Sequence, residues 1–152
     1  IKHKKIKQLG NSSPKDKKEA KAMNELFKKL DNHKIWKELG EICIACGKCS
    51  IVCPTCFCFD FDDEISPTKS CRNRIWGSCF YQDFTKIAGG YVFKDKVADR
   101  IKFWYMHKFL RIPKEYGMLG CVKCGRCADV CPVEIDIKAN IKRLKKVSGS
   151  VE

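Results

Sequence analysis

Apolar residues near the start of the chain recur at helical spacing. Ser13 and Pro14 can serve as the N-cap and the first residue of a helix. The apolar residues that follow at intervals of three and four positions are Ala20, Met23, Leu26, Phe27 and Leu30. Because lysines fill the other positions, the pattern predicts one amphipathic helix of about four turns. A shorter helix is predicted from His33 to Leu39, ending at Gly40.

A second amphipathic pattern closes the chain. Asp136 is placed as an N-cap, and apolar residues recur at Ile137, Ile141, Leu144 and Val147. This pattern predicts a helix that ends near residues 148–149. A further helix is expected within residues 97–110, and short strands are possible near residues 57–61. The predicted fold class is therefore mainly α.

The cysteine content adds evidence about function, because cysteine accounts for 12 of the 152 residues. Eight of the cysteines form a motif that occurs twice, as CIACGKCSIVCP from Cys43 and as CVKCGRCADVCP from Cys121. The chain opens without the apolar segment of an export signal, so a secreted disulfide scaffold is not expected. Thiolates spaced three residues apart in one tight loop favour a metal centre over a disulfide.

The spacing of each motif is that of bacterial ferredoxins, which bind [4Fe-4S] clusters and in which the fourth cysteine binds the other cluster of the pair. The motif therefore predicts two [4Fe-4S] clusters with crossed ligands. Gly47 and Gly125 are expected to let each loop turn tightly around its cluster. One ligand set is Cys43, Cys46, Cys49 and Cys131, and the other is Cys53, Cys121, Cys124 and Cys127.

Two zinc sites are the alternative interpretation of the same cysteines. Zinc sites usually combine pairs of cysteines with a second pair or with histidines. The three histidines, His3, His33 and His107, lie outside both motifs. The duplicated spacing therefore favours iron and sulfide over zinc.

Four cysteines remain outside the motifs: Cys56, Cys58, Cys71 and Cys79. Four thiols are enough for a possible third metal site, and an incomplete ligand set there would leave an open iron for catalysis. The alternative is that these residues are small buried side chains or free thiols.

The segment between the motifs, residues 55–120, carries fourteen of the sixteen aromatic residues. This aromatic-rich insertion is expected to supply the hydrophobic core. The predicted organisation is a basic helical lead-in over residues 1–33, a dicluster domain over residues 34–147 and a tail over residues 148–152.

Charge and motifs narrow the functional classes. The 31 Lys and Arg residues exceed the 18 Asp and Glu residues, which gives a net charge of +13. No apolar stretch is long enough to span a membrane. Because the sequence has no nucleophile triad, phosphate loop or dinucleotide fingerprint, no catalytic residue is predicted. The clusters are then the reactive groups, and the basic surface is expected to dock an acidic protein partner.

Basic side chains near the clusters are expected to raise their reduction potentials, the candidates being Arg72, Arg74, Lys123 and Arg126. The alternative function is a basic nucleic-acid-binding protein stabilised by zinc or by a cluster. That function is disfavoured because the lysine-rich lead-in offers only Phe27 and Trp36 for base stacking.

Several segments together resemble one known family. They are Cys53-Pro54-Thr55-Cys56-Phe57-Cys58-Phe59-Asp60, the run from Arg72 to Cys79, Phe84, Ala88-Gly89-Gly90, His107-Lys108-Phe109 and Gly120 to Cys127. Over residues 34–145 the chain is similar to the dicluster iron-sulfur subunit of sulfhydrogenase (the beta subunit) and of anaerobic sulfite reductase (the A subunit).

The resemblance implies a helical-ferredoxin-like fold and an electron-transfer role in a cytoplasmic complex of anaerobic metabolism. Its implied partners are a flavin-containing electron-transfer subunit and a catalytic oxidoreductase subunit. Nucleic acid is not expected as a partner. Known members have a further N-terminal region and bind no substrate of their own in this subunit.

Overall fold

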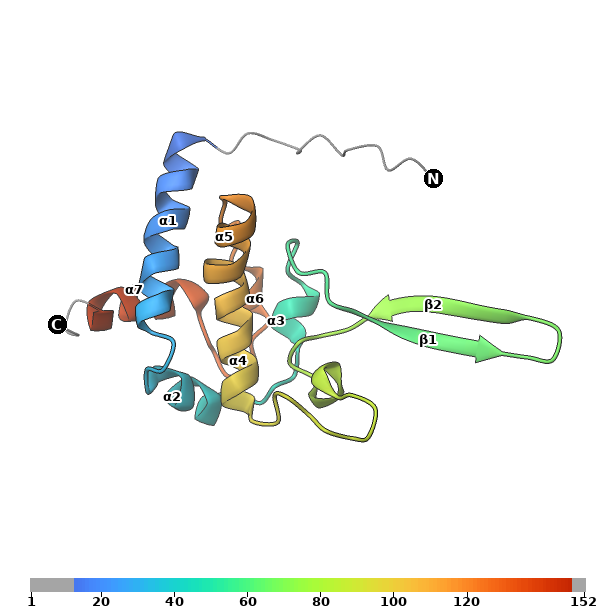
Figure 1. Cartoon of the computed structure of the whole chain (residues 1–152). Helices are drawn as coiled ribbons and strands as arrows, with labels where there is room; N and C mark the ends of the chain where they lie inside the picture. The colour runs from blue at the N-terminus through green and yellow to red at the C-terminus, as the bar shows by residue number, and fades with distance from the viewer. Residues whose placement is uncertain (1–12, 149–152) are drawn as a thin grey trace.

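The computed structural model describes residues 13–148 and consists mainly of helices, with one β-hairpin projecting from them (Figure 1). The mainly α prediction is confirmed. In chain order the elements are α1 (Pro14–Lys29), α2 (Ile35–Ile42), α3 (Lys48–Ile51), β1 (Phe59–Ile65), β2 (Ser70–Trp76), η1 (Gln82–Thr85), α4 (Val97–Met106), η2 (His107–Arg111), α5 (Ile112–Tyr116), α6 (Arg126–Asp129) and α7 (Ile137–Ser148). No helix in residues 13–148 has the length and apolar character needed to span a membrane.

Local sequence signals place the two long terminal helices as predicted. Ser13 caps α1, since its Oγ accepts a hydrogen bond from the Asp16 N–H at 3.2 Å and the Asp16 carboxylate accepts one from the Ser13 N–H. At the other end, the Asp136 carboxylate accepts a hydrogen bond from the Lys138 N–H at 2.7 Å, in the first turn of α7. Both helices are therefore specified by caps and apolar spacing within their own segments.

The predicted end of the second helix at Gly40 is wrong. α2 continues to Ile42, and Gly40 lies inside it. A Cβ atom at Gly40 would lie 2.6 Å from Ala98 of α4, which is too close for any real contact. This glycine allows two helices to approach each other rather than ending a helix.

Aromatic rings from three helical segments form the centre of the core. Phe27 of α1 stacks on Phe109 of η2 with 5.1 Å between ring centroids, and Trp36 of α2 lies 5.7 Å from Tyr105 of α4. All four side chains are buried. Each such ring pair contributes about 0.5–1.5 kcal/mol beyond its area burial. α1, α2 and the continuous helical run from α4 to α5 thus form one scaffold.

All residues of the hairpin strands are exposed except Asn73, which is half-buried. β1 and β2 pair antiparallel, from Phe59 opposite Trp76 to Ile65 opposite Ser70, and no other strand joins them in the described residues. Arg74 covers the Phe59 ring at 4.7 Å and Arg72 covers the Phe61 ring at 5.2 Å.

The expectation that the aromatic-rich insertion supplies the core is therefore correct only in part. Phe80, Trp104, Tyr105 and Phe109 are buried. Hairpin residues cannot enter the core, because the hairpin extends away from the helices (Figure 1). The exposed aromatic residues of this segment are Phe57, Phe59, Phe61, Trp76, Tyr81, Tyr91, Phe93 and Tyr116.

Candidate metal centre

The two cysteine motifs adopt the same backbone conformation. Gly47 and Gly125 both have positive φ angles, +75° and +90°, and each precedes a short helix, α3 or α6. Two residues earlier, Ala45 and Lys123 also have positive φ, at +54° and +58°. The predicted tight turns are confirmed at both glycines. Positive φ at non-glycine residues is costly and concentrates at functional sites.

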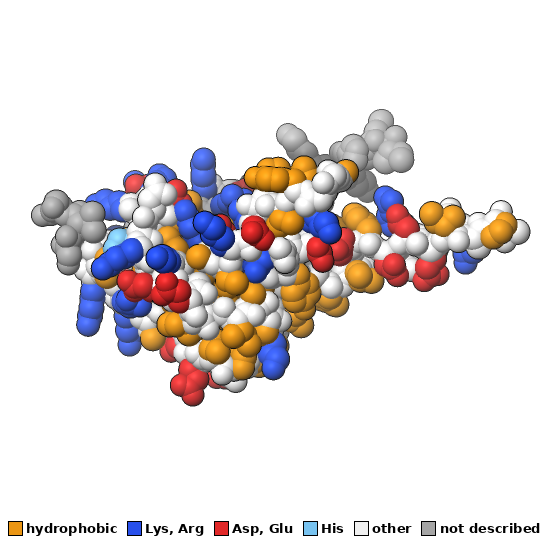
Figure 2. All heavy atoms as spheres, turned by 90° about the horizontal axis from the view of Figure 1, so that it is seen from below, with side chains coloured by type: hydrophobic (Ala, Val, Ile, Leu, Met, Phe, Trp, Pro, Cys, Tyr) orange, Lys and Arg blue, Asp and Glu red, His pale blue; other side chains and the backbone are white. Residues whose placement is uncertain are grey.

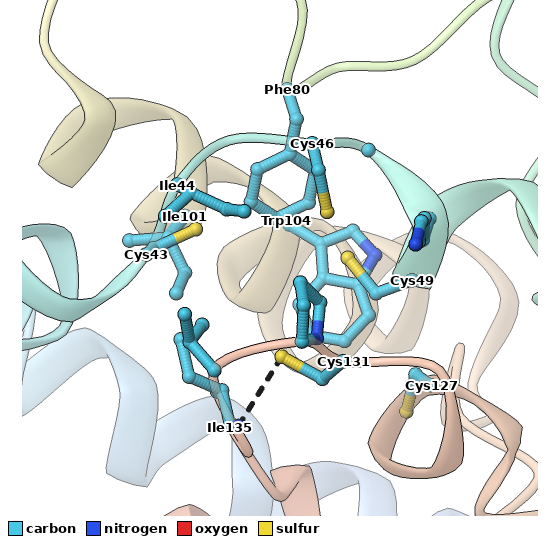
Figure 3. A pocket seen from close by; sticks show the side chains of 14 residues that line it. Cys43, Ile44, Cys46, Cys49, Phe80, Ile101, Trp104, Cys127, Cys131 and Ile135 are labelled. Carbon is cyan, nitrogen blue, oxygen red and sulfur yellow. Dashed lines mark hydrogen bonds between the residues drawn. The ribbon is translucent and has the colours of Figure 1, made fainter.

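The short helices α3 and α6 pack against each other and bring the two motifs together. Between them lies a cavity lined by three cysteines of the first motif, Cys43, Cys46 and Cys49, and by Cys131 of the second. Figure 3 shows these four side chains around the same space, with Cys127 at its edge. The first predicted ligand set therefore lines one cavity.

A second cavity lies beside the other loop. Cys121, Cys124 and Cys127 of the second motif line it, together with Cys53 of the first. Cys127 and Trp104 line both cavities. Trp104 is thus both a core side chain and part of the wall between the two groups of thiols.

Backbone N–H groups point at sulfur atoms of the first set. The Ala45 N–H donates to Cys43 Sγ at 3.4 Å, and the Ile135 N–H donates to Cys131 Sγ at 3.3 Å (Figure 3, dashed line for the second). Such donors stabilise negative charge on a ligand sulfur. Both hydrogen bonds therefore suit metal-bound thiolates.

Burial in the first cavity disfavours the thiolate form of its cysteines when no metal is bound. Burial, reinforced by the neighbouring Cys43 and Cys127 sulfurs, raises the pKa of Cys49 to about 12. Burial also raises the pKa of Cys43, against the effect of the buried Arg100 guanidinium nearby. Iron cations would remove this penalty, because metal binding requires and stabilises thiolates.

The second cavity contains a buried cation, Lys108 of η2. Only 2% of this residue is exposed. Its ammonium donates to Cys53 Sγ at 3.1 Å, to Thr55 Oγ1 at 3.1 Å and to the Gly120 carbonyl at 3.2 Å, and it lies 5.5 Å from the Trp104 ring centroid. Burial alone would lower the pKa of Lys108, but the neighbouring Cys56 and Cys53 sulfurs raise it.

Cys53 is the cysteine whose pKa is lowered furthest by these contacts. Hydrogen bonds from Cys56, Thr55 and Lys108 lower the pKa of Cys53 to about 4, although burial acts in the opposite direction. These contacts therefore favour negative charge on the Cys53 sulfur, and the thiolate is the form of cysteine that binds a metal.

Sequence reasoning missed the two buried cations, Lys108 and Arg100. The signal for Lys108 was present, since it is a charged residue within the apolar run from Phe103 to Leu110. Of the four cations that were expected near the clusters, Lys123 lines the second cavity. Arg72 instead pairs with Asp63 on the hairpin at 2.7 Å, and Arg74 lies over Phe59.

Three of the four cysteines outside the motifs lie near the base of the hairpin, and the fourth does not. Cys58 comes just before β1, and its carbonyl accepts a hydrogen bond from the Gly77 N–H at 3.1 Å, which places it close to Cys79. Cys71 pairs with Glu64 towards the far end of the hairpin and is exposed. At about 3.3 Å per residue, the six residue steps from Cys71 to Gly77 span about 20 Å. The hairpin therefore separates Cys71 from the possible third metal site.

Comparison with known proteins agrees with the arrangement of the motifs. Residues 42–135 match the family described as the 4Fe-4S dicluster domain. Over 104 residues the chain is 39% identical to "Sulfhydrogenase 2 subunit beta" of Pyrococcus furiosus, an alignment that covers 68% of this chain and 30% of that protein. No solved structure matches the chain.

The family match confirms the prediction of two [4Fe-4S] clusters as cofactors. It also agrees with the chemistry of the site, where eight cysteines in two motifs line two adjoining cavities. The predicted resemblance to a dicluster iron-sulfur subunit is confirmed as well. The chain belongs to the family of 4Fe-4S dicluster domains and is an iron-sulfur protein.

Proposed function

We propose that this chain passes electrons through its two [4Fe-4S] clusters as part of a hydrogenase-like or sulfite-reductase-like oxidoreductase complex. The observation that carries the proposal is that the two cavities adjoin, with Cys127 and Trp104 in the walls of both. Clusters bound in adjoining cavities can exchange electrons without any movement of the chain. The clusters supply the redox chemistry, and the protein supplies their position and electrostatic surroundings.

The proposed ligands cross between the motifs. Cys43, Cys46, Cys49 and Cys131 hold one cluster, and Cys53, Cys121, Cys124 and Cys127 hold the other. Two features support this assignment: all four members of each set line one cavity, and the Cys53 sulfur accepts a hydrogen bond from the buried Lys108 ammonium beside the second loop. Crossed ligands would join the two halves of the domain into one folding unit, because each cluster binds only when both halves meet.

We also propose that residues 34–147 are a cluster-binding domain of the helical-ferredoxin type, preceded by a basic segment over residues 1–33 and followed by a tail over residues 148–152. Residues 1–12 and 149–152 of these two segments lie outside the described part of the chain. The helical run from α4 to α5 links the first motif to the second, which supports this assignment. Within the described part of the first segment, α1 packs on η2 and α5.

The proposed partners are a flavin-containing subunit and a catalytic oxidoreductase subunit in the cytoplasm, with no nucleic acid. The relative from Pyrococcus furiosus is itself a subunit of a sulfhydrogenase, which supports a catalytic partner. The chain spans about 30% of the length of that relative.

Iron and acid-labile sulfide content tests the cofactor assignment directly. Anaerobically purified protein should contain at least about eight iron and about eight sulfide per monomer, as two [4Fe-4S] clusters require. The reduced protein should give an EPR spectrum with two interacting signals, because the clusters adjoin. About two zinc per monomer without sulfide would contradict the proposal and favour the zinc alternative.

Electron transfer from a reduced flavoprotein partner should slow as salt increases. Many Lys and Arg side chains are spread over the helical body, and Asp and Glu side chains lie among them there and along the hairpin (Figure 2). Opposite charge on a partner would speed encounter, and this effect weakens as the Debye length falls from roughly 14 to about 4 Å between about 0.05 and 0.5 M salt. Stopped-flow bleaching of the clusters measures the rate. A rate independent of salt, with sub-micromolar RNA or DNA binding at physiological salt, would instead favour the nucleic-acid alternative.

A further inference from the structure

A surface groove with an apolar floor lies where α7 passes α1 (Figure 1), and its volume is about 310 Å³. The floor is formed by Met23 of α1, Phe109 of η2, and Ile137 and Ile141 of α7. Three of these side chains are buried, and Ile141 is half-buried. Apolar surface with a charged rim is typical of a site that binds another molecule.

Four exposed lysines form the rim of this groove. Lys138, Lys142 and Lys145 lie four and three residues apart, which places them on one face of α7, and Lys123 comes from the second motif. Lys123 is paired with Glu19 at 2.7 Å. Within residues 13–148, the three lysines of α7 make no ion pair. The rim therefore presents positive charge that the described part of the chain does not neutralise.

The groove shares a wall with the second cysteine-lined cavity. Cys121, Lys123 and Ile137 line both spaces, and Cys121 is a proposed ligand of the second cluster. Two other surface cavities, one at the base of the hairpin and one beside α4, share no lining residue with either cysteine-lined cavity. A molecule seated in the groove would thus be separated from the second cluster by one layer of side chains.

Charge selects among the possible occupants of the groove. A second copy of this chain would bring a net charge of +13 to a surface that is already positive. Residues 1–12 contain four lysines and no acidic residue, so the groove would repel them too. Carboxylates of a separate protein would meet complementary charge, which speeds encounter and orients the partner.

We propose that this groove docks the acidic surface of an electron-transfer protein and that electrons enter the second cluster through the shared wall. This inference rests on the proposed function and adds to it a docking surface and the chemistry of the partner. The reduced flavin of the partner loses one electron, and the oxidised second cluster gains it. The rim lysines contact carboxylates of the partner, and the floor takes up an apolar side chain between them.

Charge reversal on the rim tests the proposal in the whole chain, with reduced flavodoxin, a small acidic flavoprotein, as the probe. In stopped flow at about 0.05 M salt, Lys142→Glu combined with Lys145→Glu should slow reduction of the clusters about tenfold. Lys34→Glu combined with Lys37→Glu makes the same change in net charge at exposed positions at the start of α2, and it should slow reduction less than about twofold. At about 0.5 M salt the rates of all three proteins should converge.

Cross-linking locates the contact independently of the rate. Carbodiimide joins carboxylates to lysine amines that they touch, so mass spectrometry of the wild-type complex with flavodoxin should find cross-links at Lys138, Lys142 or Lys145. Each variant should also keep about eight iron per monomer and show the wild-type EPR spectrum after reduction with dithionite. These controls separate loss of docking from loss of clusters.

Several results would overturn the docking groove and leave the proposed function intact. They are equal slowing by both double variants, no slowing by either, or failure of flavodoxin to reduce wild-type protein whose clusters dithionite reduces. A dimer of this chain that Lys142→Glu and Lys145→Glu dissociate would assign the groove to a second copy instead. RNA or DNA binding at physiological salt that the same changes abolish, with electron transfer unaffected, would assign it to nucleic acid. Absence of iron and sulfide from the wild type would overturn the proposed function as well.

Discussion

Replacing Cys53 by Ala should remove the cluster held by the other cysteine motif. Cys53 lines the second cavity with Cys121, Cys124 and Cys127, and its sulfur accepts a hydrogen bond from Lys108. The variant should lose about four iron per monomer, and one of the two interacting EPR signals should disappear. Cys131→Ala should cause the reciprocal loss of the first cluster.

Double variants identify which cluster each cysteine holds. Combining Cys53→Ala with Cys121→Ala should lose no more iron than either change alone, since both remove the same cluster. Combining Cys53→Ala with Cys43→Ala should lose about eight iron, because the two changes act on separate clusters. Cys71→Ala serves as the control for loss of a thiol. The reverse pattern of additivity would mean that each motif holds its own cluster.

Replacing Lys108 by Met should lower the reduction potential of the second cluster by about 0.1 V. Lys108 donates to Cys53 Sγ at 3.1 Å and is buried, so little water screens its charge. The magnitude corresponds to a unit charge about 6 Å from the cluster at an effective dielectric constant of about 20. An EPR-monitored redox titration measures it.

Two further variants separate charge from packing at this position. Lys108→Arg keeps the charge and should restore most of the potential, whereas Lys114→Met removes an exposed lysine from the adjacent helix α5 and should change nothing. If Lys108→Met keeps its iron and has the wild-type potential, the ammonium does not tune the cluster. If Lys108→Met loses iron, the same comparison with Lys108→Gln tests whether polarity alone retains the cluster.

The sequence alone determined the features that depend on neighbouring residues. Ser13 and Asp16 cap α1 through contacts three residues apart, and the apolar spacing after Asp136 specifies α7. The cysteine motifs likewise carry their own geometry, since the positive φ angles at Gly47 and Gly125 arise within each loop. Local hydrogen bonds and backbone preferences act over a few residues, so they can be recognised without a fold.

The tertiary structure alone decided which distant residues share a site. Gly40 stays inside α2 because Ala98 of α4 approaches it, and Lys108 reaches Cys53 because η2 packs over the first motif. The hairpin places Cys71 far from the other three cysteines outside the motifs, and it places several aromatic rings at the surface. These outcomes depend on contacts between segments far apart in the chain, and the residue types at either end of such a contact do not specify their partner.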